Sequence, residues 1–345
     1  MSIIPVTVPT GAIRYNTDSN KMECFNGTKW MQISVSSPDL GKATNSPESI
    51  GGARGFNIGG YSPAYTDIID YVTIATKGDA TDFGNLNTAT HLLAGTASKT
   101  RAVVGGGSPS NDEIQYFTMS SLGNAADFGN LSDTRYGLAA VGNETRGIFV
   151  SGYMPYANKN TIDYVTVASL GDAKDFGDSI HPFYGGCSAN SSTRGITGGG
   201  TNPTPAGSQV NAMQYITIAS LGNAQDFGDM YRTQYYTHSC ICSSTRGVFG
   251  GGYYPAAPAD TSDIHYITMA TLGNSVSFGD LTSERWSQTG TSSKIRGLFM
   301  GGRTPTLVNN IDYITIATQG DAVDFGDTTS TEAYGTATSN DHGGL

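Results

Sequence analysis

The sequence has few charged residues, few cysteines and no long apolar run. Charged residues make up 14% of the 345 residues, whereas roughly 25% is usual. The net charge of -10 argues against electrostatic binding of nucleic acid or an anionic membrane. No apolar run approaches the roughly 18 residues of a membrane helix. The first residues contain no basic segment followed by an apolar one, so we expect no secretory signal.

Metal-binding and catalytic patterns are also missing. The four cysteines, Cys24, Cys187, Cys240 and Cys242, are too few and too scattered for a disulfide framework. Cys240 and Cys242 fall on one face of an expected strand, but no further ligand is near in sequence, so we interpret them as buried thiols. The five histidines form no H-x-x-x-H or H-x-H pair. We therefore expect no metal, no cofactor and no enzymatic activity.

Glycine is abundant, and most of it belongs to a repeat. The chain has 46 glycines. The segment R-G-V-F-G-G-G at 246–252 recurs in weaker form, followed each time by a motif such as I-D-Y-V-T-I-A-T-K-G-D-A-T-D-F-G at 69–84. The leading arginine returns every 45–52 residues, at Arg54, Arg101, Arg146, Arg194, Arg246 and Arg296. This period is typical of the blades of a β-propeller.

Each repeat is predicted to form four strands. The first is small and apolar, as at 136–142, the second carries the arginine, as at 147–152, and the third alternates, as at 70–76. The fourth is short and contains D-F-G. A Gly-Asp or Gly-Asn pair joins the last two strands in every copy, and it predicts a two-residue type II′ hairpin.

The chain ends predict how the repeats close. Residues 44–50 make a poor first strand because they contain Pro47, whereas residues 333–345 resemble a first strand with no second strand after it. Residues 331–341 are therefore expected to complete the blade at 54–87. The predicted fold is all-β: a six-bladed propeller of four-stranded blades at 46–345, closed by its C-terminal strand. A small β-meander with a linker precedes it at 1–45, its strands within 11–33.

The repeated charged residues are interpreted as structural, because they recur in every blade. Each arginine is expected to lock turns of the blade through a carboxylate or a backbone group. The candidate carboxylates precede F-G, at Asp82, Asp127, Asp175, Asp226 and Asp324.

The unequal loops are the better candidates for recognition, because loops on a rigid scaffold carry specificity. The candidate ligand-binding residues are Tyr61, Tyr65, Tyr153, Tyr156, Tyr231, Tyr253, Tyr254 and Trp286. The first residues of the first strands should form a ring at the channel mouth, from His91, Tyr136, Tyr184, Tyr236, Trp286 and Tyr334. Such rings suit glycans or protein surfaces, but packing alone is an open alternative.

Two resemblances extend this interpretation. The apolar strand ending in Gly-Gly, followed by a strand bearing a tyrosine, resembles a kelch repeat, with phenylalanines such as Phe83 and Phe128 nearest to the usual tryptophan. The segment G-A-I-R-Y-N-T-D-S-N-K-M-E-C-F-N-G-T-K-W at 11–30 resembles a module of tailed-bacteriophage tail fibres and other virion proteins. The repeat is also similar to repeats in structural proteins of phages, particularly phages of marine cyanobacteria.

The resemblances imply a virion component that assembles in the host cytoplasm. Residues 1–45 would attach it to other virion proteins or to copies of itself, and the propeller would be displayed for attachment to a host glycan or protein. A capsid decoration or head-fibre protein without a receptor role is one alternative. A carbohydrate-active propeller enzyme is another, and a cellular kelch-type interaction module is a third.

Overall fold

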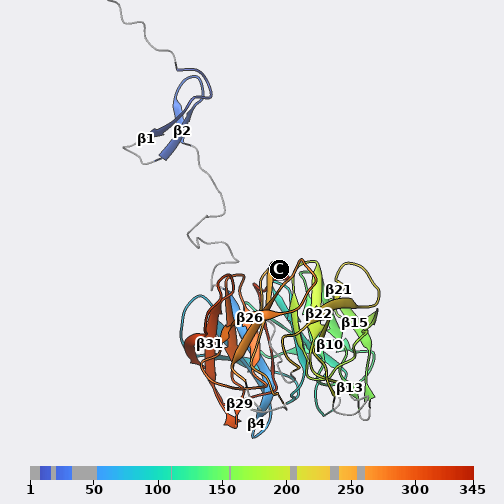
Figure 1. Ribbon diagram of the computed structural model, residues 1–345. Coiled ribbons are helices and arrows are strands. Elements are labelled where there is room, and N and C mark those ends of the chain that lie inside the picture. Colours follow the sequence, from blue (N-terminus) through green and yellow to red (C-terminus); the bar gives the residue numbers. More distant parts are fainter. Residues whose placement is uncertain are drawn as a thin grey trace, which may run out of the picture. The chain divides into compact units, whose positions relative to one another are not determined.

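The described part of the chain folds from strands and turns alone, in agreement with the predicted all-β class. The computed structural model describes residues 8–16, 21–32, 53–109, 111–154, 157–202, 208–233, 241–254 and 261–345, and none of these is helical (Figure 1). Within these ranges, therefore, no helix could cross a membrane. Two compact units are present, Met1–Ile50 and Gly51–Leu345. The predicted boundary at residue 45 lies outside the described residues.

The small unit is a three-stranded antiparallel sheet in the order β1-β2-β3. Its strands are β1 (Ile13–Asn16), β2 (Lys21–Phe25) and β3 (Trp30–Gln32), which lie within the predicted 11–33. Arg14 forms an ion pair of 2.8 Å with Glu23 and lies over the ring of Trp30. A sheet of this size is marginally stable by itself.

The large unit contains six four-stranded antiparallel sheets, numbered here along the chain. Sheet 1 is β33 (Thr336–Ser339), β4 (Arg54–Ser62), β5 (Ala64–Thr73) and β6 (Thr81–Asn85). Sheet 2 is β7 (Ala94–Ala97), β8 (Arg101–Gly105), β9 (Glu113–Thr118) and β10 (Ala126–Asn130). Sheet 3 is β11 (Ala139–Gly142), β12 (Arg146–Val150), β15 (Thr161–Thr166) and β16 (Lys174–Asp178).

Sheets 4 to 6 repeat this plan. Sheet 4 is β17 (Cys187–Asn190), β18 (Arg194–Gly198), β21 (Ala212–Thr217) and β22 (Gln225–Asp229). Sheet 5 is β23 (Ile241–Cys242), β24 (Arg246–Gly250), β25 (Asp263–Thr268) and β26 (Val276–Asp280). Sheet 6 is β27 (Thr289–Ser292), β28 (Arg296–Met300), β31 (Asn310–Thr315) and β32 (Val323–Asp327). Short hairpins extend three sheets: β13 (Tyr153–Met154) with β14 (Ala157–Asn158), β19 (Thr201–Asn202) with β20 (Ser208–Gln209), and β29 (Arg303–Thr304) with β30 (Thr306–Leu307).

The six sheets are joined through their first strands, which contact one another in a closed cycle: β33, β7, β11, β17, β23, β27 and back to β33. Between neighbouring sheets lie apolar clusters, such as the one that holds Phe56, Phe83 and Phe117. Sheet 1 takes its first strand from the C-terminus, as the sequence predicts, because β33 pairs antiparallel with β4 from Thr336↔Ile58 to Ser339↔Gly55. We call sheet 1 the closing sheet.

The Gly-Asp and Gly-Asn pairs do not form two-residue hairpins, so that prediction is wrong. In the closing sheet, β5 ends at Thr73 and β6 begins only at Thr81. The pair instead joins neighbouring sheets. The backbone N–H of Gly78 donates to the carbonyl of Phe325 at 3.0 Å, and the Asp79 carboxylate accepts from the N–H of Asp327 at 3.1 Å. The same two bonds recur at all six junctions, which explains the repeated Gly-Asx and Phe-Gly.

The six repeated arginines also join neighbouring sheets. Each guanidinium donates a hydrogen bond of 2.8–2.9 Å to a backbone carbonyl just beyond the third strand of the next sheet, at Met119, Val167, Ile218, Met269, Ile316 and Ile74 in chain order. Each also lies 4.5–5.0 Å from the ring centroid of a tyrosine in its own sheet. Of the two predicted partners, the structure shows the backbone group.

The aspartates before F-G have a different position from the one expected. Asp82, Asp127, Asp175, Asp226 and Asp324 are exposed, and none of the hydrogen bonds or ion pairs found among the described residues joins them to an arginine. The reason is a β-bulge between the third and fourth strands at this point. The phenylalanine that follows the aspartate is buried there, while the aspartate side chain stays in solvent.

Removing one arginine bond should measurably weaken one junction. We expect Arg101→Met to lower the free energy of unfolding by about 1 kcal/mol, because it removes a charged donor and a cation–π contact that are partly solvent-screened. Chemical denaturation measures this. Lys99→Met, a change in the exposed turn two residues earlier, is the matched control and should leave the unfolding free energy within experimental error. Equal effects of the two changes would contradict a role for Arg101 at the junction.

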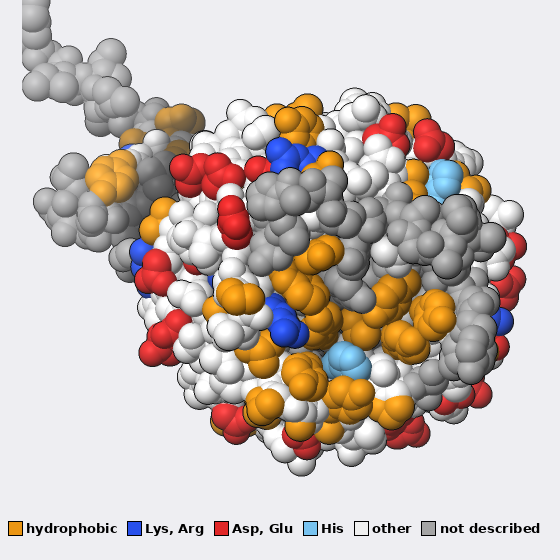
Figure 2. Space-filling model, turned by 60° about the horizontal axis from the view of Figure 1, so that its bottom comes forward, with side chains coloured by type: hydrophobic (Ala, Val, Ile, Leu, Met, Phe, Trp, Pro, Cys, Tyr) orange, Lys and Arg blue, Asp and Glu red, His pale blue; other side chains and the backbone are white. Residues whose placement is uncertain are grey.

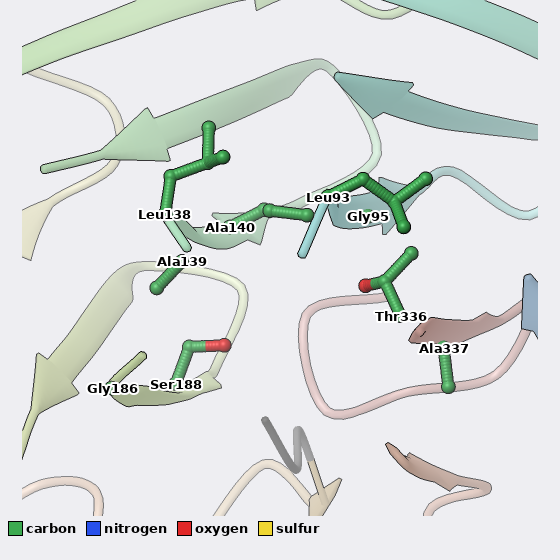
Figure 3. A pocket seen from close by; sticks show the side chains of 10 residues that line it. Leu93, Gly95, Leu138, Ala139, Ala140, Gly186, Ser188, Thr336 and Ala337 are labelled. Carbon is green, nitrogen blue, oxygen red and sulfur yellow. The ribbon is translucent and has the colours of Figure 1, made fainter. Parts of the chain in front are cut away.

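Small side chains and the C-terminal tail fill the middle of the cycle. Leu93, Leu138, Ala140, Ser188 and Thr336 are among the residues that line a cavity of about 20 Å³ (Figure 3), which has room for about one water molecule. At the end where β4 begins, the tail is buried: the ring of His342 contacts the carbonyl of Ala97 at 3.0 Å and the Asn190 amide at 3.2 Å. This cavity, lined by described residues, is therefore too small for a larger ligand.

Candidate functional site

Aromatic side chains gather at the end of the large unit where β13 and β29 lie. Figure 2 looks onto this end and shows hydrophobic side chains over much of it, with few charges among them. The rings come from different sheets and contact one another. We call this group the aromatic face, made of Tyr61, Tyr65, His91, Tyr136, Tyr153, Tyr184, Tyr253, Trp286 and Tyr334.

One continuous series of rings spans the closing sheet and its neighbours. Tyr65 stacks on His91 with centroids 4.4 Å apart, and His91 meets Tyr334 edge-on at 6.0 Å. Tyr334 meets the edge of Trp286 at 5.5 Å, and Tyr253 follows at 5.6 Å from Trp286. The guanidinium of Arg303 lies 5.7 Å from the Trp286 centroid. Burial lowers the pKa of His91, which favours the neutral ring at neutral pH.

A second group of rings joins sheets 3 and 4. Tyr136, Tyr153 and Tyr184 lie within 5.4–5.8 Å of one another, centroid to centroid. All three are half-buried, so each ring is held in place by neighbours while part of its surface meets solvent. Such rings lose little conformational entropy when they bind a ligand.

The backbone positions these rings by a repeated bridge. His91, Tyr184 and Trp286 each form an isolated β-bridge with the residue that follows Gly-Gly in the second-strand motif, as in Trp286↔Arg303, and Tyr136 forms the same bridge with Tyr153, which follows Ser151-Gly152. The residue after each bridge residue has a positive φ in every described copy. Its carbonyl accepts a hydrogen bond from the backbone of the following sheet. The N–H of Leu92, for example, donates to the carbonyl of Tyr334 at 2.7 Å. The backbone segments that carry the rings are therefore hydrogen-bonded to one another between sheets.

Four of the described residues of the predicted ring occupy the bridge position. At the closing sheet that position holds Ala333, which pairs with Tyr61. Tyr334 is one residue further along, with φ +62°, where Gly137 and Gly185 occupy the equivalent places. Its ring nevertheless contacts His91 and Trp286. Tyr236, the sixth predicted member, lies outside the described residues, as does Tyr156 of the ligand-binding set.

A polar cluster on sheet 5 breaks the repeat symmetry of this end. Arg232 and Asp263 form an ion pair of 2.9 Å, and the Arg232 guanidinium lies 5.5 Å and 5.9 Å from the rings of Tyr231 and Tyr254. Behind Tyr231 lies His265, which is 1% exposed. Burial lowers its pKa to about 4, against the opposing effect of Asp263, so His265 is neutral at neutral pH.

The described ranges hold no group of three His, Cys, Asp or Glu side chains that could bind a metal ion. Cys187 and Cys242 are buried, and Cys240 lies outside the described residues.

A row of buried polar residues had no clear signal in the sequence. The third strands carry Asp70, Gln115, Asp163, Gln214, His265 and Asp312 at equivalent register positions, each at most 3% exposed. Most anchor the segment that crosses into their sheet: Thr329 donates to Asp70, Ser132 to Asp163 and Thr282 to Asp312. The polar residue in an otherwise apolar third strand was the available signal.

Comparison with known proteins identifies no relative. No protein-family model matches the chain, and no curated protein is significantly similar to it. The geometry of the aromatic face is therefore the basis for assigning a function.

Proposed function

We propose that the chain is a non-enzymatic structural protein of a tailed-bacteriophage particle, and that its large unit is a six-bladed β-propeller that attaches to a saccharide of the host surface. Six four-stranded sheets with first strands in a closed cycle are what a propeller of this size requires. The resemblance of residues 11–30 to a virion module supports the particle, with residues 1–45 as the anchor. Electron microscopy of an intact particle would test that location.

The observation that carries the attachment role is the aromatic face. Its rings are partly exposed, held by neighbouring sheets, and carry tyrosine hydroxyls beside apolar surfaces. Such amphipathic rings suit a ligand with apolar faces and many hydroxyl groups. Among the described residues, the charged groups near the rings are few: Arg303 contacts Trp286, Arg232 is paired with Asp263, and Lys159 is paired with Asp133. A neutral saccharide therefore fits this face better than an acidic one.

The course of the chain supports display of this face. β4 begins at Arg54, beside the end of β33, and runs to Tyr61 on the aromatic face. The chain thus enters the large unit at the end away from the rings.

Changing the rings should reduce attachment without loosening the fold. We expect the combined change Tyr153→Ala, Tyr253→Ala and Tyr254→Ala to lower binding of the full chain to host-surface polysaccharide at least tenfold, since each lost aromatic contact removes roughly 0.5–1.5 kcal/mol. Binding is measured on immobilised polysaccharide, with the unfolding midpoint measured alongside.

The matched control lies at the other end of the sheets. Leu170→Ala and Leu221→Ala change exposed side chains in the loops after the third strands, and this variant should bind like the unchanged protein. Binding by all variants alike would contradict the attachment role and favour a decoration protein. Binding to a host protein in place of polysaccharide would contradict the saccharide assignment, and cleavage of the bound saccharide would favour an enzyme.

A further inference from the structure

Two sheets bury an ion pair between the crossing segment and the third strand. Arg135 pairs with Asp163 in sheet 3, and Arg285 pairs with Asp312 in sheet 6, each at 2.8 Å and each with at most 1% of either side chain exposed. A buried carboxylate of this kind is tolerable because a cation neutralises it.

The closing sheet has an acid where these sheets have the arginine. The carbonyls of Arg135 and Arg285 accept a hydrogen bond from the second glycine of Gly106-Gly107 and Gly251-Gly252, and the carbonyl of Glu332 accepts the same bond from Gly302. Glu332 therefore occupies the arginine position. Asp70 occupies the position of Asp163 and Asp312 on the third strand. The closing sheet thus buries two carboxyl groups at a place where sheets 3 and 6 each hold an ion pair.

Among the described residues, no positively charged group acts on either acid. Glu332 is 4% exposed and Asp70 is 1% exposed. The Asn57 amide on β4 donates to the Glu332 carboxyl and accepts from the Thr289 hydroxyl on β27. Asp70 accepts from Thr329, but its second oxygen, Oδ1, is buried with no hydrogen-bond partner. The charged group acting on Glu332 is Asp70, and the one acting on Asp70 is Asp82 on β6.

We propose that Glu332 and Asp70 form a proton-dependent latch for the closing sheet. One proton held on Glu332 beside Asp70 keeps the crossing segment and β33 docked on β4. Two buried carboxylates in one site cannot both be ionised without a large cost. Loss of the proton to solvent places a second negative charge in a site without a cation, which favours release of residues 328–339. The edge of β4 would then be open to another strand.

The direction of the pH effect follows from the proton balance. Burial and the charge of Asp70 together raise the pKa of Glu332 to about 8, against the lowering effect of the Asn57 bond. Its ordinary value is 4.5. The folded protein therefore holds more protons at Glu332 than the unfolded chain between these values. The contribution of Glu332 to stability is fully present below about 4.5, falls as pH rises, and is lost above about 8.

Thermal unfolding of the full chain across this pH range tests the latch. We expect the unfolding midpoint to fall by roughly 5 °C between about pH 5 and about pH 9. Glu332→Gln should remove most of this fall, because the amide cannot ionise. Glu284→Gln, at an exposed acid in the corresponding crossing segment of sheet 6, should retain it. Glu332→Arg should also remove the fall, because it restores the ion pair found in sheets 3 and 6.

Two results would overturn the latch. If the midpoints of the unchanged protein and Glu332→Gln fall in parallel with pH, Glu332 does not carry the effect. If millimolar Ca²⁺ or Mg²⁺ raises the midpoint of the unchanged protein near pH 8 but not that of Glu332→Gln, the acid pair holds a cation in place of a proton. Should Glu332→Arg fail to fold, Asp70→Asn is the second variant, and it should lessen the fall as Glu332→Gln does.

Discussion

Deletion of residues 331–345 should leave a protein that is insoluble or polydisperse. This segment supplies β33, whose four residues are all buried, and the tail around His342 that fills one end of the cycle. Without it, the nine-residue strand β4 would present an unpaired edge and the first strands of sheets 2 and 6 would lose their neighbour. Such an edge pairs readily with other chains. Size-exclusion chromatography with light scattering measures the outcome.

A shorter deletion separates the strand from the tail. Removal of residues 343–345 keeps β33 and takes away the hydrogen bond from Gly343 to the carbonyl of Cys242, so this variant should stay monodisperse with a modestly lower unfolding midpoint. A peptide of residues 331–345, added during refolding of the long deletion, should restore part of the monodisperse fraction. A long deletion that is monodisperse and unfolds cooperatively would argue against closure by the C-terminal strand.

Gly177→Ala should be among the most destabilising single changes in the chain. Gly177 follows Phe176 in β16, where sheets 3 and 4 meet. A Cβ there would lie 2.5 Å from the carbonyl carbon and oxygen of Gly222, and both atoms belong to a backbone fixed by the bond from Gly222 to Phe176. Together with the cost of its φ of +147°, we expect a loss of about 4 kcal/mol in unfolding free energy.

Gly222→Ala is the matched control because its conformation is the same. Gly222 also has φ +147°, but a Cβ there meets no atom within 4 Å. Only the backbone strain remains, so we expect a loss of about 1 kcal/mol. Urea unfolding of both variants measures the difference, which isolates the steric contact between sheets. Similar losses for the two variants would mean that the sheets can separate there at little cost.

Much of the architecture could be predicted because it repeats. A period of 45–52 residues shows where each sheet begins, and a spare strand at 333–345 shows where the last one ends. Local chemistry was less informative. The Gly-Asp pair has the composition of a tight hairpin, but its partners, such as Phe325 for Gly78, lie on another sheet. Hydrogen bonds to a distant segment leave no signal in the local sequence.

The candidate site was predicted in part. An unequal loop predicts Tyr153, and the recurring first residue of the first strands predicts Trp286. The structure places both in contact with rings of neighbouring sheets. Tyr334 lies one residue beyond the bridge position, which Ala333 holds. The face as a whole depends on which sheets are neighbours.

The sequence by itself determined the all-β class, the repeat period and the strand that completes the closing sheet, because each follows from local pattern and chain order. The tertiary structure decided the rest. The repeated arginine at the start of a strand is visible in the sequence. Only the packed sheets show that its guanidinium donates a hydrogen bond to a backbone carbonyl of the next sheet. Likewise, Glu332 and Asp70 are 262 positions apart, and only closure of the cycle brings the two acids to a site where sheets 3 and 6 have an ion pair. Short-range preferences are encoded in the residues, whereas burial and charge pairing depend on which segments meet.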